Sequence, residues 1–142
     1  MTVYVDSSFL LSLYVVDAHS VEVDRRMASL PAVQITPFNR AEVAVALHQQ
    51  VFLQRMKLVD AMQSWRDFEG DCRSGLLTTV GFPELAWVRT VDLARRHGAI
   101  FGVRALDSLH VACALELAAE RFWTFDERQQ RLAQAVGLDT NP

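Results

Sequence analysis

Two carboxylates stand directly after short apolar runs of the chain, at positions where the strands of a parallel sheet would end. Asp6 follows residues 3–5, and Asp126 follows residues 122–125. The carboxyl ends of the strands in an open parallel sheet form the edge at which ligands bind. If both runs are strands, both carboxylates lie at that edge.

Two further acids are expected near the same edge, because each falls close to the start of a helix. Glu42 lies in the second turn of the helix expected after a strand at residues 33–35. Asp107 opens a helix whose apolar residues recur at helical spacing over residues 106–117. The four acids then map to one edge of one sheet.

Each of these acids also has an ordinary structural explanation when it is taken alone. Asp107 near a helix N-terminus is stabilised by the helix dipole by roughly 0.3–1 kcal/mol. Asp6 suits a turn, and Asp126 suits the N-cap of the last helix. Glu42 suits the solvated side of a helix. Their joint convergence on one edge is harder to explain by these local roles and favours a functional site.

Carboxylates gathered in this way need a positive partner. Two unit charges about 4 Å apart repel each other by roughly 4 kcal/mol at an effective dielectric constant near 20. Oxygen ligands without histidine or cysteine suit hard cations, so Mg²⁺ or Mn²⁺ is the expected occupant. Such an ion can orient a phosphodiester and generate hydroxide from a bound water, which makes phosphodiester hydrolysis the expected chemistry.

The elements that must position the acids are short apolar runs alternating with helical patterns. Strands are expected at residues 3–5, 32–35, 76–80 and 122–125. Helices are expected at residues 9–14, 21–29, 37–52, 58–75, 83–97, 105–117 and 128–136. Strands that are separated by helices need crossover connections, which predicts an α/β fold with a mostly parallel sheet and helices on both faces.

Local signals at both ends support several of these helices. Thr36 followed by Pro37 is a strong helix start, with the hydroxyl as N-cap and the proline at the first helical position. Gly98 and Gly137 are expected to end the helices that precede them.

Length and charge limit the classes of protein that remain. A chain of 142 residues predicts one domain, spanning residues 1–142. The net charge of -3 excludes a uniformly basic nucleic-acid binder, so contacts to nucleic acid must depend on local clusters of arginine. Lys57 is the one lysine among the 14 basic residues.

Cysteine usage and hydropathy indicate a soluble protein of a reducing, cytoplasmic compartment. Cys72 and Cys113 lie far apart and form no C-x-x-C pair, so neither a disulfide framework nor a zinc site is indicated. The apolar run at residues 3–16 lacks a basic leader and contains Asp6, which argues against a signal peptide. No uncharged stretch is long enough to span a membrane.

Four segments with an acid at each expected place resemble the PIN-domain ribonucleases, particularly the toxins of VapC-like toxin-antitoxin pairs. They are V-Y-V-D-S-S-F-L-L-S-L-Y at residues 3–14, T-P-F-N-R-A-E-V at 36–43, R-A-L-D-S-L-H-V-A-C-A-L at 104–115 and W-T-F-D-E-R-Q at 123–129. Each segment alone is weakly diagnostic, whereas their order and spacing are fairly specific and cover nearly the whole chain.

The resemblance implies a three-layer α/β/α fold and an acidic pocket that binds Mg²⁺ or Mn²⁺. It implies that Asp6 and Asp107 ligate the metal directly, while Glu42 and Asp126 help to hold the metal, its waters or a second ion. Hydroxyls of Ser7 or Ser8, and of Thr124, match positions that support the carboxylates; turn and cap roles explain these hydroxyls equally well.

The activity implied by the resemblance is cleavage of RNA by a metal-activated water, which leaves a 5′-phosphate and a 3′-hydroxyl without a covalent enzyme intermediate. The implied partners are a small antitoxin protein and a second copy of the chain. Arg104 departs from the expected pattern and is a candidate to contact phosphate, antitoxin or a neighbouring acid. His110 is interpreted as a hydrogen-bonded core residue rather than as a metal partner of Asp107.

Two alternatives stay open on the residues alone, and a third is strongly disfavoured. One is a different Mg²⁺-dependent phosphohydrolase with an aspartyl nucleophile, although that chemistry usually shows D-x-D where this chain has Ser8. The second is a catalytically silent PIN-fold module that binds a partner protein, against which the presence of four acids argues. The third is a receiver domain, which would need paired acids after the first strand and a later lysine.

Overall fold

The computed structural model describes all 142 residues and contains one four-stranded sheet. The strands are β1 (Thr2–Val5), β2 (Ala32–Ile35), β3 (Leu77–Thr79) and β4 (Arg121–Trp123), in the order β3-β2-β1-β4. Every neighbouring pair is parallel. The α/β class and the parallel sheet predicted from the alternating pattern are confirmed.

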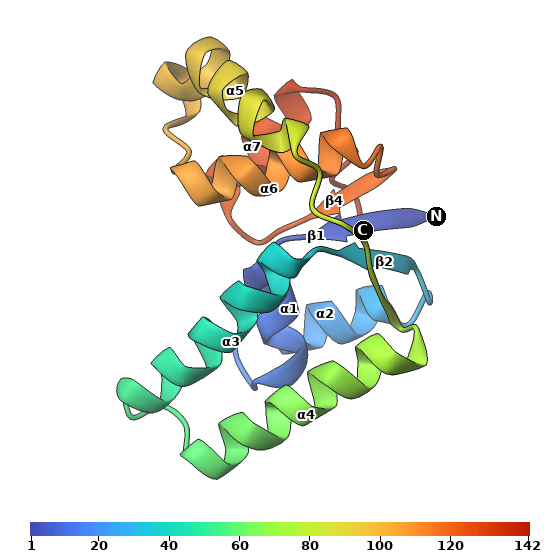
Figure 1. Cartoon of the computed structure of the whole chain (residues 1–142), viewed down its shortest axis with the longest axis vertical. Helices are drawn as coiled ribbons and strands as arrows, with labels where there is room; N and C mark the ends of the chain where they lie inside the picture. The colour runs from blue at the N-terminus through green and yellow to red at the C-terminus, as the bar shows by residue number, and fades with distance from the viewer.

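Seven helices cover the two faces of this sheet, which gives three layers (Figure 1). One face carries α1 (Ser7–Tyr14), α2 (Ser20–Met27), α3 (Pro37–Phe52) and α4 (Leu58–Ser74). The other carries α5 (Leu85–Phe101), α6 (Ala105–Glu116) and α7 (Glu127–Ala135). None of these helices combines the length and the apolar character needed to cross a membrane.

Side chains of the central strand β1 alternate between two separate hydrophobic cores. Val3 and Val5 are fully buried in the core beneath α1–α4, whereas Tyr4 is buried in the core beneath α5–α7. This alternation follows from the period of two in an extended strand. Asp6 comes next, at the end of a strand that is buried on both faces, which brings its carboxylate to the edge of the sheet.

The start of α3 shows how local sequence fixes a helix that bears an acid. The Thr36 hydroxyl caps the helix by accepting from the backbone N–H of Phe38, and Pro37 occupies the first position as expected. The Asn39 side chain reaches back to accept from the Thr36 N–H at 2.8 Å and completes a capping box. Glu42 therefore projects from a helix whose start is firmly held.

The prediction that Gly98 ends the fifth helix is wrong, because α5 continues through it to Phe101. A side chain at position 98 would meet nothing closer than the Ala94 Cβ at 3.9 Å, so this glycine has no special backbone role. The helix ends instead at Gly102, whose φ of 63° lies in the left-handed region that glycine adopts readily. The helix also begins at Leu85, two residues later than expected from Pro83.

The fourth strand is shorter than predicted and ends at Trp123 instead of residue 125. The chain turns beyond that point, since the Thr124 hydroxyl accepts from the backbone N–H of Asp126 at 3.0 Å. Asp126 is therefore separated from the strand by two residues and is the N-cap of α7.

Candidate active site at the carboxyl edge of the sheet

The four predicted acids line one cavity of about 940 Å³ at the carboxyl edge of the sheet. They come from four segments of the chain: Asp6 after β1, Glu42 on α3, Asp107 on α6 and Asp126 before α7. The sequence alone placed them at a common edge, and the structure brings all four to the same cavity. Their chemical roles are taken up below as a proposal.

Asp6 is the most deeply buried acid of the cavity, with 4% of its surface exposed. One carboxylate oxygen, Oδ1, caps α1 by accepting from the Phe9 N–H at 2.8 Å. The other, Oδ2, accepts from the Ser8 hydroxyl at 2.7 Å and lies 3.0 Å from the Thr124 hydroxyl. Burial raises the pKa of Asp6 above its usual value, although these hydrogen bonds act in the opposite direction.

Glu42 is held through one of its two carboxylate oxygens. Oε1 accepts from the Ser7 hydroxyl at 2.8 Å and from Nε2 of His110, whereas no hydrogen bond reaches Oε2. Burial alone would raise the pKa of Glu42, but His110 and Ser7 outweigh it, and the pKa lies below its usual value. The glutamate is thus an anion with one oxygen left for a ligand.

Asp107 and Asp126 likewise each keep one oxygen without a hydrogen bond. Asp107 lies in the first turn of α6, and its Oδ2 accepts from Nε of Arg104 at 3.3 Å. Asp126 caps α7, with its Oδ1 accepting from the Gln129 N–H at 2.8 Å. The dipole and capping roles considered for these acids are therefore real, and they leave Oδ1 of Asp107 and Oδ2 of Asp126 available.

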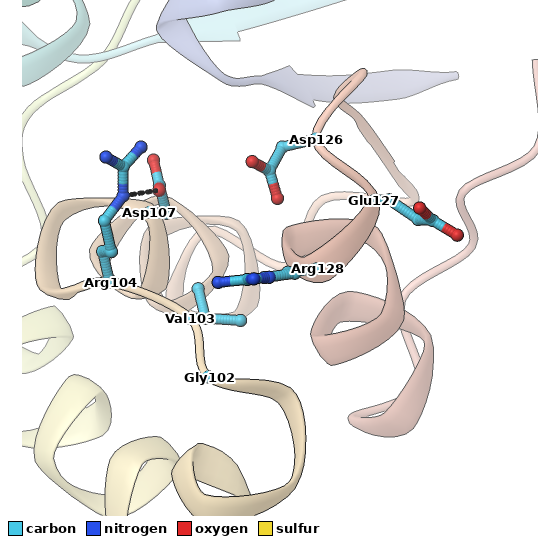
Figure 2. A pocket seen from close by; sticks show the side chains of 7 residues that line it. All are labelled: Gly102, Val103, Arg104, Asp107, Asp126, Glu127 and Arg128. Atoms are coloured by element: carbon cyan, nitrogen blue, oxygen red, sulfur yellow. Dashed lines mark hydrogen bonds and ion pairs between the residues drawn. The ribbon is translucent and has the colours of Figure 1, made fainter.

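A second, smaller cleft of about 370 Å³ adjoins the cavity and shares Arg104, Asp107 and Asp126 with it. Figure 2 shows Arg104 beside Asp107 on one wall, while the Arg128 side chain extends from the opposite wall towards Val103. Arg104 forms the ion pair with Asp107 that was one of its expected roles.

Arg128 is the positive side chain of this cleft that has no partner. Glu127, next to it in the chain, is paired with Arg131 at 2.7 Å. Asp126 is engaged in the cap of α7. No ion pair or hydrogen bond involves the Arg128 guanidinium, so it is free to bind an anion brought into the cleft.

Two buried polar residues support the acids, and neither was predicted from the sequence to do so. His110 was interpreted as a core residue; it is 2% exposed, but it also contacts Glu42. Gln129 is fully buried and lies three residues after the N-cap Asp126. That aspartate-to-glutamine spacing resembles a capping box and was the signal available for Gln129.

No three carboxylate, imidazole or thiol groups lie close enough together to enclose a metal ion in this structure. Mg²⁺ is nevertheless commonly held by one or two carboxylates, with waters and substrate phosphates completing its shell. The cavity supplies carboxylate oxygens without hydrogen bonds on Glu42, Asp107 and Asp126, and no thiol. This donor set fits a hard cation.

A parallel sheet with helices on both faces and an acidic cavity at its carboxyl edge has the architecture of α/β proteins, which bind ligands at the strand ends. The family model of the PIN domain matches residues 3–135, and the chain therefore belongs to the PIN domain family. The resemblance inferred from four segments of sequence is confirmed. Nucleases of this family generally depend on divalent metal ions.

Several solved structures share this fold over almost their whole length. VapC20 of Mycobacterium tuberculosis, described as a toxin that cleaves the sarcin-ricin loop, has a TM-score of 0.70 and 18% identity, and the match covers 99% of each chain. VapBC2 of Rickettsia felis, solved with a DNA fragment from its promoter, has a TM-score of 0.69 and 14% identity over 99% of this chain and 98% of the other. FitAcB of Neisseria gonorrhoeae has a TM-score of 0.66 and 14% identity over 99% and 97%. A comparison with curated proteins returned no match.

Proposed function

We propose that the protein is a Mg²⁺- or Mn²⁺-dependent endoribonuclease and the toxin of a toxin-antitoxin pair, with residues 1–142 forming one PIN-like domain. The observation that carries the proposal is the convergence of Asp6, Glu42, Asp107 and Asp126 on one cavity of a PIN domain. Local roles account for single acids, as the helix caps do for Asp6 and Asp126. They do not explain why four separate segments present carboxylates to the same space.

The chain's own residues supply the ligands and hold them in place. Asp6 and Asp107 are proposed as direct metal ligands, and Glu42 and Asp126 as supports for the metal, its waters or a second ion. Ser8 holds Asp6 by donating its hydroxyl hydrogen to Oδ2. A bound Mg²⁺ or Mn²⁺ would orient the phosphodiester and lower the pKa of a coordinated water.

RNA is the proposed substrate, and binding of this polyanion beside the acidic cavity requires positive charge nearby. Arg104 and Arg128 supply that charge in the cleft that shares Asp107 and Asp126 with the cavity. Guanidinium groups suit phosphates because their planar fork donates two parallel hydrogen bonds. Local arginines of this kind reconcile RNA binding with the net charge of -3.

The proposed partners are a small antitoxin protein and a second copy of the chain, in the cytoplasm. The antitoxin is supported by the toxin and toxin-antitoxin proteins among the structural neighbours. The cavity also has an apolar part, formed by residues such as Leu11, Phe38 and Val45, that can accept a protein segment.

The test is cleavage of structured RNAs by protein freed of any copurifying partner. We expect cleavage in Mn²⁺ or Mg²⁺, none in EDTA, and products ending in a 5′-phosphate and a 3′-hydroxyl. Asp107→Asn should lower the rate by more than about 100-fold, because even residues behind the metal ligands typically contribute 10- to 100-fold.

The matched control is Asp60→Asn. Asp60 also lies in the first turn of a helix, α4, but is exposed and lines neither cavity nor cleft. Its replacement should leave the rate unchanged. Cleavage that survives EDTA, or a fully active Asp107→Asn, would overturn the mechanism.

A further inference from the structure

His110 connects the buried interior of the protein with the acidic cavity. It lies on α6, one turn after Asp107, and only 2% of it is exposed. Its ring stacks on Phe38 with the centroids 4.3 Å apart and the planes 22° from parallel. One ring nitrogen faces the Tyr4 hydroxyl and the other faces Glu42, so the ring is fixed on both edges.

The neighbouring hydrogen bonds determine which nitrogen of His110 carries the proton. The Asn39 side-chain oxygen already accepts from the Thr36 backbone N–H at 2.8 Å and from the Thr36 hydroxyl at 3.0 Å. Tyr4 has a single hydroxyl proton, and its oxygen lies 2.8 Å from Nδ1 of His110 but 3.2 Å from the Asn39 oxygen. Nδ1 and the Tyr4 hydroxyl form the hydrogen bond on one edge of the ring, and on the other edge Nε2 bears a hydrogen, because the Glu42 oxygen that faces it can only accept.

The hydrogen on Nε2 is directed at Glu42. Oε1 of Glu42 accepts it together with the Ser7 hydroxyl, whose oxygen lies 2.8 Å away. Two donors on Oε1 fix the plane of the carboxylate and leave Oε2 without a hydrogen bond. A glutamate on a helix has three rotatable side-chain bonds, so a fixed donor from another element is an effective way to set its orientation.

We propose that His110, oriented by Tyr4, is a positioning residue that holds Glu42 by Oε1 so that Oε2 is presented to the metal ion or to a water bound to it. This inference rests on the proposed metal-dependent function and adds a role to a residue outside the four acids. It resembles the way in which ligands in metal sites are oriented by hydrogen-bonding partners behind them. His110 contributes a fixed hydrogen bond and does not itself contact metal or substrate.

The first test reads the position of the imidazole hydrogen directly and needs neither metal nor RNA. Long-range ¹H–¹⁵N NMR spectra of the metal-free protein should show a proton on Nε2 of His110, the nitrogen that faces Glu42. An Nε2 without a proton in the unmodified protein would overturn the inference.

The second test measures Mn²⁺ affinity by calorimetry. His110→Phe keeps an aromatic ring on Phe38 but removes both nitrogens, and it should weaken binding by about 10- to 100-fold. His110→Gln keeps an N–H donor that reaches Glu42, and it should stay within about threefold of the unmodified protein. His48→Phe makes the same change at an exposed histidine of α3 and should have no effect.

The comparison of the two His110 variants separates positioning from simple packing. Equal losses of Mn²⁺ affinity in His110→Phe and His110→Gln, or unchanged affinity in a folded His110→Phe, would contradict the inference. Thermal unfolding of each variant shows whether it is folded. If the unmodified protein shows the proton on Nε2 but binds no Mn²⁺, the proposed function fails while the hydrogen bond to Glu42 stands.

Discussion

The side-chain amide of Gln129 donates to the backbone carbonyl of Asp107 at 3.0 Å, which bonds α7 to the acid-bearing turn of α6. The amide oxygen of the same residue accepts from the Thr124 hydroxyl at 2.6 Å, and its backbone N–H donates to Asp126. Gln129 is therefore a fully buried residue whose hydrogen bonds connect the two segments that carry Asp107 and Asp126. Its position has consequences for stability as well as for the geometry of the cavity.

Gln129→Met should lower the free energy of unfolding by about 1–3 kcal/mol, measured by urea denaturation. The thioether fills a similar volume but makes neither the hydrogen bond to the Asp107 carbonyl nor the one from the Thr124 hydroxyl, and each such bond contributes about 0.5–1.5 kcal/mol. The rate of RNA cleavage should also fall under conditions in which the variant is folded, because Asp107 and Asp126 lose their common support.

Gln130→Met is the control for this change. Gln130 is the next residue of α7, is less buried, and makes only a 3.4 Å contact to the Thr140 hydroxyl. If Gln129→Met lowers the free energy of unfolding no more than Gln130→Met does, the side-chain hydrogen bonds of Gln129 contribute nothing to stability.

Asp6→Asn should abolish metal-dependent cleavage and at the same time stabilise the metal-free protein near neutral pH. Burial raises the pKa of Asp6 in the folded state, so its ionised form is less favourable there than in the unfolded chain. An asparagine keeps the oxygen that caps α1 at Phe9 and carries no charge. The prediction is checked by urea denaturation in EDTA, with Asp60→Asn as the control.

The difference in stability between Asp6→Asn and the unmodified protein should change with pH in a definite direction. Below the unfolded-state pKa of about 3.9, Asp6 is protonated in both states, and its ionisation costs no stability. As the pH rises through the higher folded-state pKa, that cost appears in the unmodified protein but not in Asp6→Asn. The gain in stability of Asp6→Asn should therefore grow from acidic to neutral pH. An equal gain at acidic and at neutral pH would contradict the conclusion that burial raises the pKa of Asp6.

Mg²⁺ should stabilise the folded protein, because it relieves repulsion among carboxylates that converge only after folding. At a concentration 100-fold above its dissociation constant, a ligand specific for the folded state adds about 2.7 kcal/mol to the free energy of unfolding. Thermal unfolding with MgCl₂ and with NaCl at equal ionic strength measures the effect. Asp107→Asn should reduce the stabilisation; equal shifts for both salts would mean that no specific site exists.

Arg128→Gln should weaken RNA binding and make it less sensitive to salt. If Arg128 contacts one phosphate of a single strand, its loss should reduce the slope of log affinity against log salt by about 0.7. Fluorescence anisotropy with labelled RNA in EDTA measures binding without cleavage. Arg95→Gln removes an exposed arginine of α5 that also lacks an ion pair, and it should leave the slope unchanged.

Local signals in the sequence were sufficient for most of the fold. Thr36 and Pro37 marked the start of α3 to the residue, and the alternation of apolar runs with helices predicted the parallel sheet. The errors were in the ends of elements. The sequence predicted that Gly98 ends the fifth helix, and only the packed backbone shows that Gly102 takes the left-handed conformation and ends it.

The four acids show the division between sequence and structure most clearly. Because a strand of a parallel sheet delivers the residue after it to one edge, the sequence by itself determined that Asp6 and its three counterparts approach a common edge. It did not determine which oxygens stay free, since that depends on hydrogen bonds between residues far apart in the chain. Ser7 and His110, 103 positions apart, meet at Glu42 only after α1, α3 and α6 have packed. Tertiary structure alone decided that a histidine and a glutamine hold the acids, because buried polar groups take whatever partners the packing brings within reach.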